Sequence, residues 1–129
     1  MTNIEIAKTY IKAAQAGDQA LLASVISPEV VWHQPGNNQF SGTHRGIANV
    51  GAMLGRMMEV SQGTFMLSNA SHFMANGDWV AIQLEFAGQR DGARLAQPGV
   101  DLIRIENGKI AEVRLFSSNQ DEEDFFWGK

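Results

Sequence analysis

Asp101 is the residue of this sequence that most directly suggests chemistry. It lies in the alternating stretch VDLIRI, residues 100–105, where Ile103 and Ile105 share its face of a predicted strand. A carboxylate on a buried face must be paired, hydrogen-bonded or protonated, because an isolated buried charge is too costly. The alternative, that Asp101 faces solvent at a strand end, is equally compatible with the alternation.

A second candidate, His33, lies in the stretch VVWHQPG, residues 30–36. Strand alternation places Trp32 and Gln34 on one face and His33 on the opposite face. A bulge at residues 35–36 could turn His33 inward. The chain has no cysteine, and His33, His44 and His72 match no ligand spacing, so we predict no metal site.

The elements that must position these residues are helices in the first half of the chain and strands in the second. Apolar residues at three- and four-residue spacing predict helices over residues 3–16, 21–26 and 47–58, and a short strand is expected at residues 30–32. Alternation then predicts strands over residues 64–75 and 79–90, followed by a hairpin over residues 100–119 that turns at Asn107-Gly108. We therefore predict one α+β domain over residues 1–129, with three N-terminal helices packed on a strongly curved antiparallel sheet that forms a cone.

The hollow of such a cone is a common kind of ligand site. Val80, Ile82, Leu84 and Phe86 share one face of their strand and are expected to line it. Phe40 is the only large apolar residue of a polar loop and could act as a lid. Met57 belongs to a methionine-rich helix face, which is either core or an adaptable pocket wall.

The last nine residues combine charge with aromatic side chains. The acidic run over residues 121–124 is expected to be solvated rather than part of a site. The aromatic residues at positions 125–127 are expected to be buried, because exposed aromatic clusters are unfavourable in water.

Composition narrows the classes of function. The net charge of −4 argues against a nucleic-acid partner, since phosphate binding needs a clustered basic face. No segment has the length and apolar character of a membrane span or a signal peptide, so we expect a soluble, cytoplasmic protein without a membrane partner.

Several of these stretches, in this order, resemble one family. They are residues 10–18, YIKAAQAGD; residues 30–36, VVWHQPG; residues 82–90, IQLEFAGQR; residues 100–105, VDLIRI; and the Asn107-Gly108 turn. The chain resembles the ketosteroid isomerase and SnoaL-like polyketide cyclase group, within the nuclear transport factor 2-like fold. The resemblance covers nearly the whole chain.

The resemblance implies a role for particular residues. Tyr10 and Asp101 correspond to the tyrosine and the protonated aspartic acid that bind the substrate oxyanion in the isomerases, a case used as a standard example of a neutral buried acid. The isomerase base corresponds to Gln34, and the acid of the cyclases to Ser118 or Asn119; none of these side chains titrates usefully. The resemblance also implies a homodimer and no metal or organic cofactor.

Two hypotheses follow for the function. The first is an isomerase or cyclase that acts on a small hydrophobic carbonyl compound, with Tyr10 and Asp101 stabilising an enolate and with His33, His44, a substrate group or water carrying the proton. The second is a protein that binds such a molecule without converting it. The expected substrate contacts are Trp32, Gln34, Phe40, Met57, Ile82, Leu84, Phe86, Val113, Phe116 and Asn119.

Overall fold

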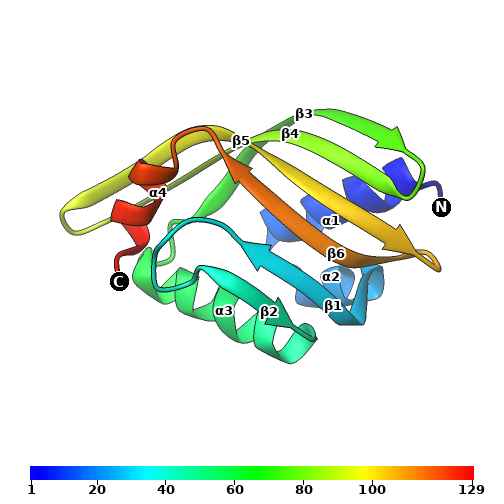
Figure 1. The fold of residues 1–129 in the computed structure, drawn as a ribbon, viewed down its shortest axis with the longest axis horizontal. Coiled ribbons are helices and arrows are strands. Elements are labelled where there is room, and N and C mark those ends of the chain that lie inside the picture. Colours follow the sequence, from blue (N-terminus) through cyan, green and yellow to red (C-terminus); the bar gives the residue numbers. More distant parts are fainter.

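The computed structural model describes residues 1–129 and confirms the predicted α+β class (Figure 1). The predicted helices are present, and a fourth, short helix follows the last strand. In chain order the elements are α1 (Asn3–Ala16), α2 (Gln19–Val25), β1 (Ile26–Gln34), β2 (Gly42–Arg45), α3 (Ile47–Val60), β3 (Met66–Asn76), β4 (Trp79–Arg90), β5 (Ala93–Glu106), β6 (Lys109–Ser117) and α4 (Gln120–Trp127).

Local capping fixes the start of the first two helices. The Thr2 hydroxyl accepts from the backbone N–H of Glu5, and the Glu5 carboxylate accepts from the N–H of Thr2. This capping box makes Thr2 the N-cap of α1. Asp18 is the N-cap of α2, because its carboxylate accepts from the N–H of Leu21.

The six strands form one sheet in the order β2-β1-β6-β5-β4-β3. All neighbouring strands are antiparallel except β1 and β6, which are parallel. β1 is longer than its predicted residues 30–32 because it is hydrogen-bonded between β2 and β6. β5 is also longer than predicted. It continues through Pro98, which lacks an N–H but accepts from the N–H of Ser118 through its carbonyl.

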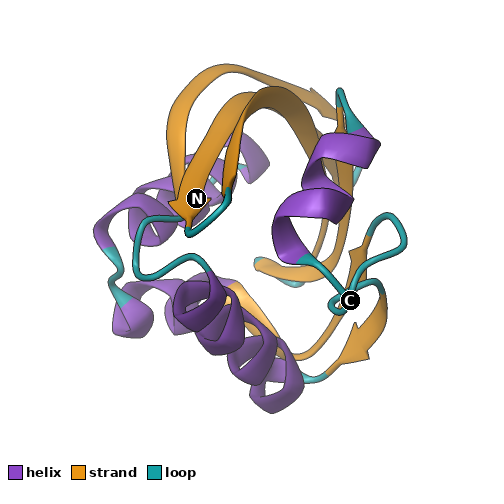
Figure 2. Cartoon of the chain, turned by 90° about the vertical axis from the view of Figure 1, so that its left-hand side faces the viewer, coloured by secondary structure: helices purple, strands orange, loops and turns teal.

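The strands curve strongly around the helices, as Figure 2 shows. Alternating side chains of β4 and β5 are buried on the concave face: Val80, Ile82, Leu84, Phe86, Asp101, Ile103 and Ile105. The burial of Asp101 decides between the two interpretations of its strand, because its side chain does not face solvent. No helix is long and apolar enough to cross a membrane.

Close packing leaves no room for a side chain at Gly99 of β5. A Cβ atom at this position would lie 2.5 Å from the carbonyl oxygen of Phe116 and 2.8 Å from the ring of Phe86. Gly99 therefore allows β6 and the Phe86 ring to approach β5 next to Asp101.

Candidate active site

A cavity of about 550 Å³ lies between the concave face of the sheet and the helices α1, α3 and α4. Most of its lining is apolar, as expected for a small-molecule site. Eight of the predicted site residues line it: Tyr10, Trp32, Gln34, Met57, Leu84, Phe86, Asp101 and Phe116. Phe116 borders the cavity, but it is paired with Val100, so its side chain belongs to the face of the sheet opposite Asp101, and the residue is 55% exposed.

The structure brings Tyr10 and Asp101 together in this cavity. Tyr10 lies on the buried face of α1, and Asp101 lies on the concave face of β5. The Tyr10 hydroxyl donates to Asp101 Oδ2 over 3.3 Å, and the two residues are only 3% and 7% exposed. Two oxygen-bearing groups that are 91 positions apart in sequence therefore meet inside an apolar hollow.

Burial makes both groups favour their neutral forms. Burial raises the pKa of Asp101 from 3.8 to about 7; the hydrogen bond from Tyr10 acts in the opposite direction, and the negative charge of Glu123 adds to the increase. Burial also raises the pKa of Tyr10 well above its usual value. A neutral Asp101 has an O–H of its own that is free for a ligand, and the Tyr10 O–H becomes a second donor when it turns from Asp101 to the ligand.

Trp32 and Gln34 form a second polar contact at the cavity wall. They share one face of β1, and the Trp32 indole N–H donates to Gln34 Oε1 over 3.0 Å. Gln34 is 5% exposed and lies at the position that the resemblance assigns to the base. Its amide oxygen is already occupied by Trp32, and an amide does not take up a proton at neutral pH.

Glu123 is a site residue that the sequence analysis missed, because the acidic run at 121–124 was predicted to be solvated. These residues instead form part of α4, where Glu123 is 4% exposed and lines the cavity with Trp127. A helical periodicity was the available signal: Phe126 and Trp127 follow Glu123 by three and four residues, and Asn119 caps the helix. Other lining residues not predicted include Leu22, Leu54, Phe65, Leu67, Leu115 and Ser117.

The helix α4 is fixed at one end of the cone by polar contacts. The Asp124 carboxylate accepts from the backbone N–H of Asn37 over 3.1 Å and from the Asn38 amide over 2.8 Å. Arg90 donates to the carbonyl of Phe126 over 2.6 Å. Glu123 is therefore presented to the cavity by a helix that is held from two sides.

The structure places His33 outside the cavity. Its Nε2 lies 2.7 Å from Glu112 Oε2 and its Nδ1 lies 3.3 Å from Thr43 Oγ1. The strand alternation is regular through Gln34, so no bulge turns the imidazole inward. A catalytic contact of His33 with a ligand in the cone is therefore not available in this arrangement.

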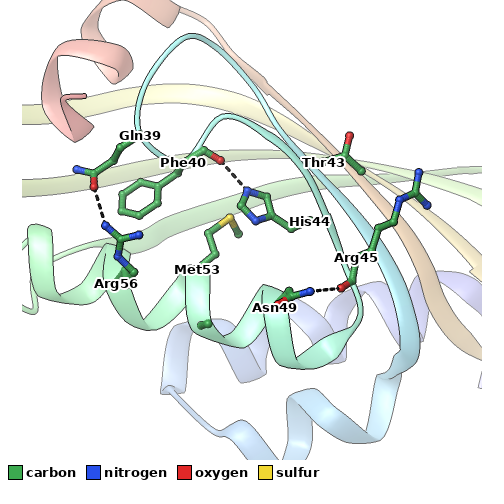
Figure 3. Close-up of a pocket in the computed structure, with 9 residues that line it drawn as sticks. Gln39, Phe40, Thr43, His44, Arg45, Asn49, Met53 and Arg56 are labelled. Carbon is green, nitrogen blue, oxygen red and sulfur yellow. Dashed lines mark hydrogen bonds between the residues drawn. The ribbon is translucent and has the colours of Figure 1, made fainter.

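Phe40 and His44 belong to a separate recess between β2 and α3, of about 390 Å³ (Figure 3). Phe40 is 2% exposed and packs edge-on against Trp127, with ring centroids 5.3 Å apart, so it is a core residue rather than a lid over the cone. His44 Nε2 donates to the Phe40 carbonyl over 2.7 Å (Figure 3). Arg56 donates to Gln39 beside them.

Four other residues that were expected to line the cavity are structural. Val80, Ile82 and Val113 are fully buried in the core and do not reach the cavity surface. The Asn119 side chain accepts from the N–H of Glu122 and serves as the N-cap of α4. Histidine, aspartate and glutamate residues form no group of three that could hold a metal ion.

Comparisons with known proteins show which family and which solved structures this chain resembles. Residues 7–113 match the SnoaL-like domain family. The chain is 67% identical to a protein of unknown function with a cystatin-like fold from Xanthomonas campestris, with 100% of both chains covered and a TM-score of 0.97. It is 25% identical to Bal32a from a soil-derived mobile gene cassette, over 97% of this chain and 95% of that chain, with a TM-score of 0.91.

A proposed polyketide cyclase from Pseudomonas putida KT2440 shares the fold. It is 22% identical over 99% of each chain, with a TM-score of 0.74. No curated protein is significantly similar in sequence. The resemblance inferred from the sequence is thus confirmed, because the family match covers most of the chain: the protein belongs to the SnoaL-like domain family.

Proposed function

We propose that the protein binds a small, apolar carbonyl compound in the cone and stabilises its enolate, and so acts as an isomerase or cyclase. The observation that carries this proposal is the Tyr10–Asp101 pair, 3.3 Å apart and buried in the cavity. Fold relatives that are proposed to be polyketide cyclases are consistent with it.

The chemistry of the pair suits an oxygen that gains negative charge. A carbonyl oxygen beside this pair can accept two O–H hydrogen bonds, one from the neutral Asp101 carboxyl and one from Tyr10, once the Tyr10 O–H turns from Asp101 Oδ2 to the ligand. These bonds strengthen as the oxygen becomes an enolate oxygen, because charge is concentrated on it in a site with little water. The apolar lining favours a substrate whose remaining surface is hydrocarbon.

A carrier without catalysis is the second candidate, and Gln34 is the observation that favours it. The position that would hold the base in the isomerases is an amide whose oxygen already accepts from Trp32. A protein with both donors and no proton acceptor would bind a carbonyl compound and leave it unchanged.

Proton exchange at carbon distinguishes the two candidates without knowledge of the natural substrate. The probe is 2-tetralone, an apolar ketone whose α-protons exchange with D₂O only through the enol or enolate. An enzyme is expected to accelerate this exchange above the buffer rate, and Asp101→Leu and Tyr10→Phe to reduce the acceleration. Exchange at the buffer rate with the wild-type protein would contradict the enzyme proposal.

Binding is measured in parallel with 2-naphthol, an aromatic enol, and naphthalene, which has the same rings without the oxygen. Calorimetric titration is expected to give tighter binding of 2-naphthol, and Asp101→Leu is expected to remove this preference. Preference for the naphthol without exchange of 2-tetralone would support the carrier. Equal binding of the two probes would mean that the pair does not recognise an oxygen.

We also propose a homodimer formed through the convex face of the sheet. On this face Phe116 and Met74 are 55% and 56% exposed, and Leu102 and Trp79 are partly exposed. Apolar side chains gathered on one sheet face favour association with a second copy of the chain, and homo-oligomers most often pair the same surface twice.

A further inference from the structure

We infer that Glu123 is the proton acceptor of this site: its carboxylate removes a proton from the carbon next to the carbonyl group whose oxygen Tyr10 and Asp101 hold. The inference rests on the proposed enolate chemistry and supplies the base that Gln34 cannot provide. It concerns a residue of α4, which lies beyond the residues matched by the family.

The hydrogen bonds of Glu123 hold its carboxylate in place but leave capacity for a proton. Oε1 accepts from the Ser117 hydroxyl over 2.6 Å and from the Gln120 amide over 3.0 Å, and Oε2 accepts from the Trp127 indole over 3.1 Å. A carboxylate has about four lone-pair sites, so three donors leave one, on Oε2. The residue lines the cavity, so a ligand in the cone can reach it.

No positively charged side chain neutralises this carboxylate. Its three donors are a hydroxyl, an amide and an indole, and no salt bridge involves Glu123. A ligand that enters the cone therefore meets a carboxylate with no cation bound to it.

The register of β5 and β6 places Ser117, the residue that donates to Glu123, close to the donor pair. Asp101 is paired with Leu115, and Gly99 is paired with Ser117, the residue that donates to Glu123. The two pairs are separated by two residues along the strands, which corresponds to about 7 Å. Ser117 is therefore one inward-facing step of the ladder from Asp101, and the Glu123 carboxylate is hydrogen-bonded to its hydroxyl inside the same cavity.

The spacing of Asp101 and Ser117 along the ladder is comparable with the span that abstraction of an α-proton requires. A hydrogen bond to the carbonyl oxygen spans about 2.7 Å. The oxygen and the α-carbon are about 2.4 Å apart from standard bond lengths. The base approaches the carbon to about 3 Å. A bent chain of these three spans covers about 7 Å.

The step balances without a further reactant. The α-carbon loses its proton to Glu123, the C–H electron pair forms the carbon–carbon double bond of the enolate, and the carbonyl π pair moves onto the oxygen held by Tyr10 and Asp101. In an isomerisation, protonated Glu123 returns the proton to another carbon of the conjugated system. In a cyclisation, the enolate carbon attacks a second carbonyl group of the same molecule, and the proton goes to the resulting alkoxide.

The test is Glu123→Gln, which keeps the size of the side chain and removes its basicity, with Asp121→Asn as the control. Asp121 is exposed in the same helix, and its carboxylate makes no side-chain hydrogen bond. Glu123→Gln is expected to lower the α-exchange rate of 2-tetralone by a factor of ~10² to 10⁴, the usual contribution of a general base. The affinity for 2-naphthol is expected to stay near the wild-type value, whereas the thermal midpoint is expected to fall because the new amide faces the indole N–H of Trp127. Asp121→Asn is expected to leave all three quantities unchanged.

Exchange by Glu123→Gln at the wild-type rate would overturn the inference and leave the proposed function intact. Absence of exchange by the wild-type protein would overturn both. If Glu123→Gln does not fold, because its amide meets the indole N–H of Trp127, then Glu123→Asp decides. This variant keeps the charge and moves the carboxylate back by one carbon; at least tenfold slower exchange with unchanged 2-naphthol binding supports the inference, and unchanged exchange overturns it.

Discussion

Replacement of Asp101 by asparagine is expected to make the stability of the protein much less dependent on pH. The asparagine has the shape of the neutral acid, and its amide oxygen can accept from the Tyr10 hydroxyl as Asp101 Oδ2 does. It cannot ionise, so the variant removes one titration from the folded and the unfolded chain and leaves the packing of the cone in place.

The sign of the effect follows from the raised pKa. Burial raises the pKa of Asp101 from 3.8 to about 7, so between these pH values the folded protein holds a proton that the unfolded chain has released. The free energy of unfolding therefore falls as pH rises through this window, and levels off above pH 7. At about 1.36 kcal/mol for each pH unit, an increase in pKa from 3.8 to about 7 corresponds to about 4 kcal/mol. This is a large part of the stability of a typical domain.

Urea denaturation from pH 4 to pH 8.5, at one protein concentration, measures the effect. The wild-type protein is expected to lose about 4 kcal/mol relative to Asp101→Asn over this range. With a typical slope of about 2 kcal/mol per molar urea, the difference between the two midpoints changes by roughly 2 M. Asp91→Asn, which removes an exposed carboxylate from the β4–β5 turn, is the control. If the curves of the wild-type protein and Asp101→Asn stay parallel over the whole range, Asp101 is not held neutral and the proposed donor pair is wrong.

Three substitutions and one measurement of mass test other parts of the structure. Tyr10→Phe removes the hydrogen bond that lowers the pKa of Asp101, so carboxyl NMR is expected to show a pKa above 7; an unchanged value would mean that the bond is absent. Gly99→Ala is expected to cost about 1–3 kcal/mol in urea unfolding, because the new Cβ meets the carbonyl of Phe116; a neutral change would contradict this packing. Gln34→Asp adds a second carboxylate to the wall and is expected to raise 2-tetralone exchange, an increase that Asp101→Leu should abolish; an inactive but folded variant would favour the carrier. Sedimentation at micromolar concentration is expected to give twice the chain mass of 14.1 kDa, and a monomer would exclude the dimer.

The fold was largely predictable because its signals are local. Alternation on both sides of Asn107-Gly108 predicted the β5–β6 hairpin, and the helical spacing of apolar residues predicted α1 and α3. The parallel pairing of β1 with β6 was not predictable, because the two strands are far apart in sequence and no periodicity records which strands become neighbours. The strand β2 was missed since its four residues, Gly42–Arg45, are mostly exposed and carry no alternation.

The site was predictable where a residue stands out against its surroundings. Asp101 is a carboxylate among alternating apolar residues. The sequence allowed either a buried or a solvent-facing position for it, and the structure shows that it is buried. Glu123 could not be identified in the same way, because three acidic neighbours make the run resemble a solvated surface. His33 lies between Trp32 and Gln34 in sequence, and both of these residues line the cavity. Adjacent side chains of a strand point to opposite faces, so His33 points away from it.

The position of α4 also bears on how proteins of this kind diverge. The family match ends at residue 113, whereas Glu123 and Trp127 reach the cavity from a helix of eight residues after the last strand. The sheet and α1 can keep the proposed oxygen-binding groups while a substitution at Glu123, the polar residue of this helix that lines the cavity, changes the chemistry of the wall. Related proteins can thus acquire different reactions through changes in the short helix α4. We expect that a comparison of α4 between relatives separates proteins with different reactions more clearly than a comparison of the shared domain does.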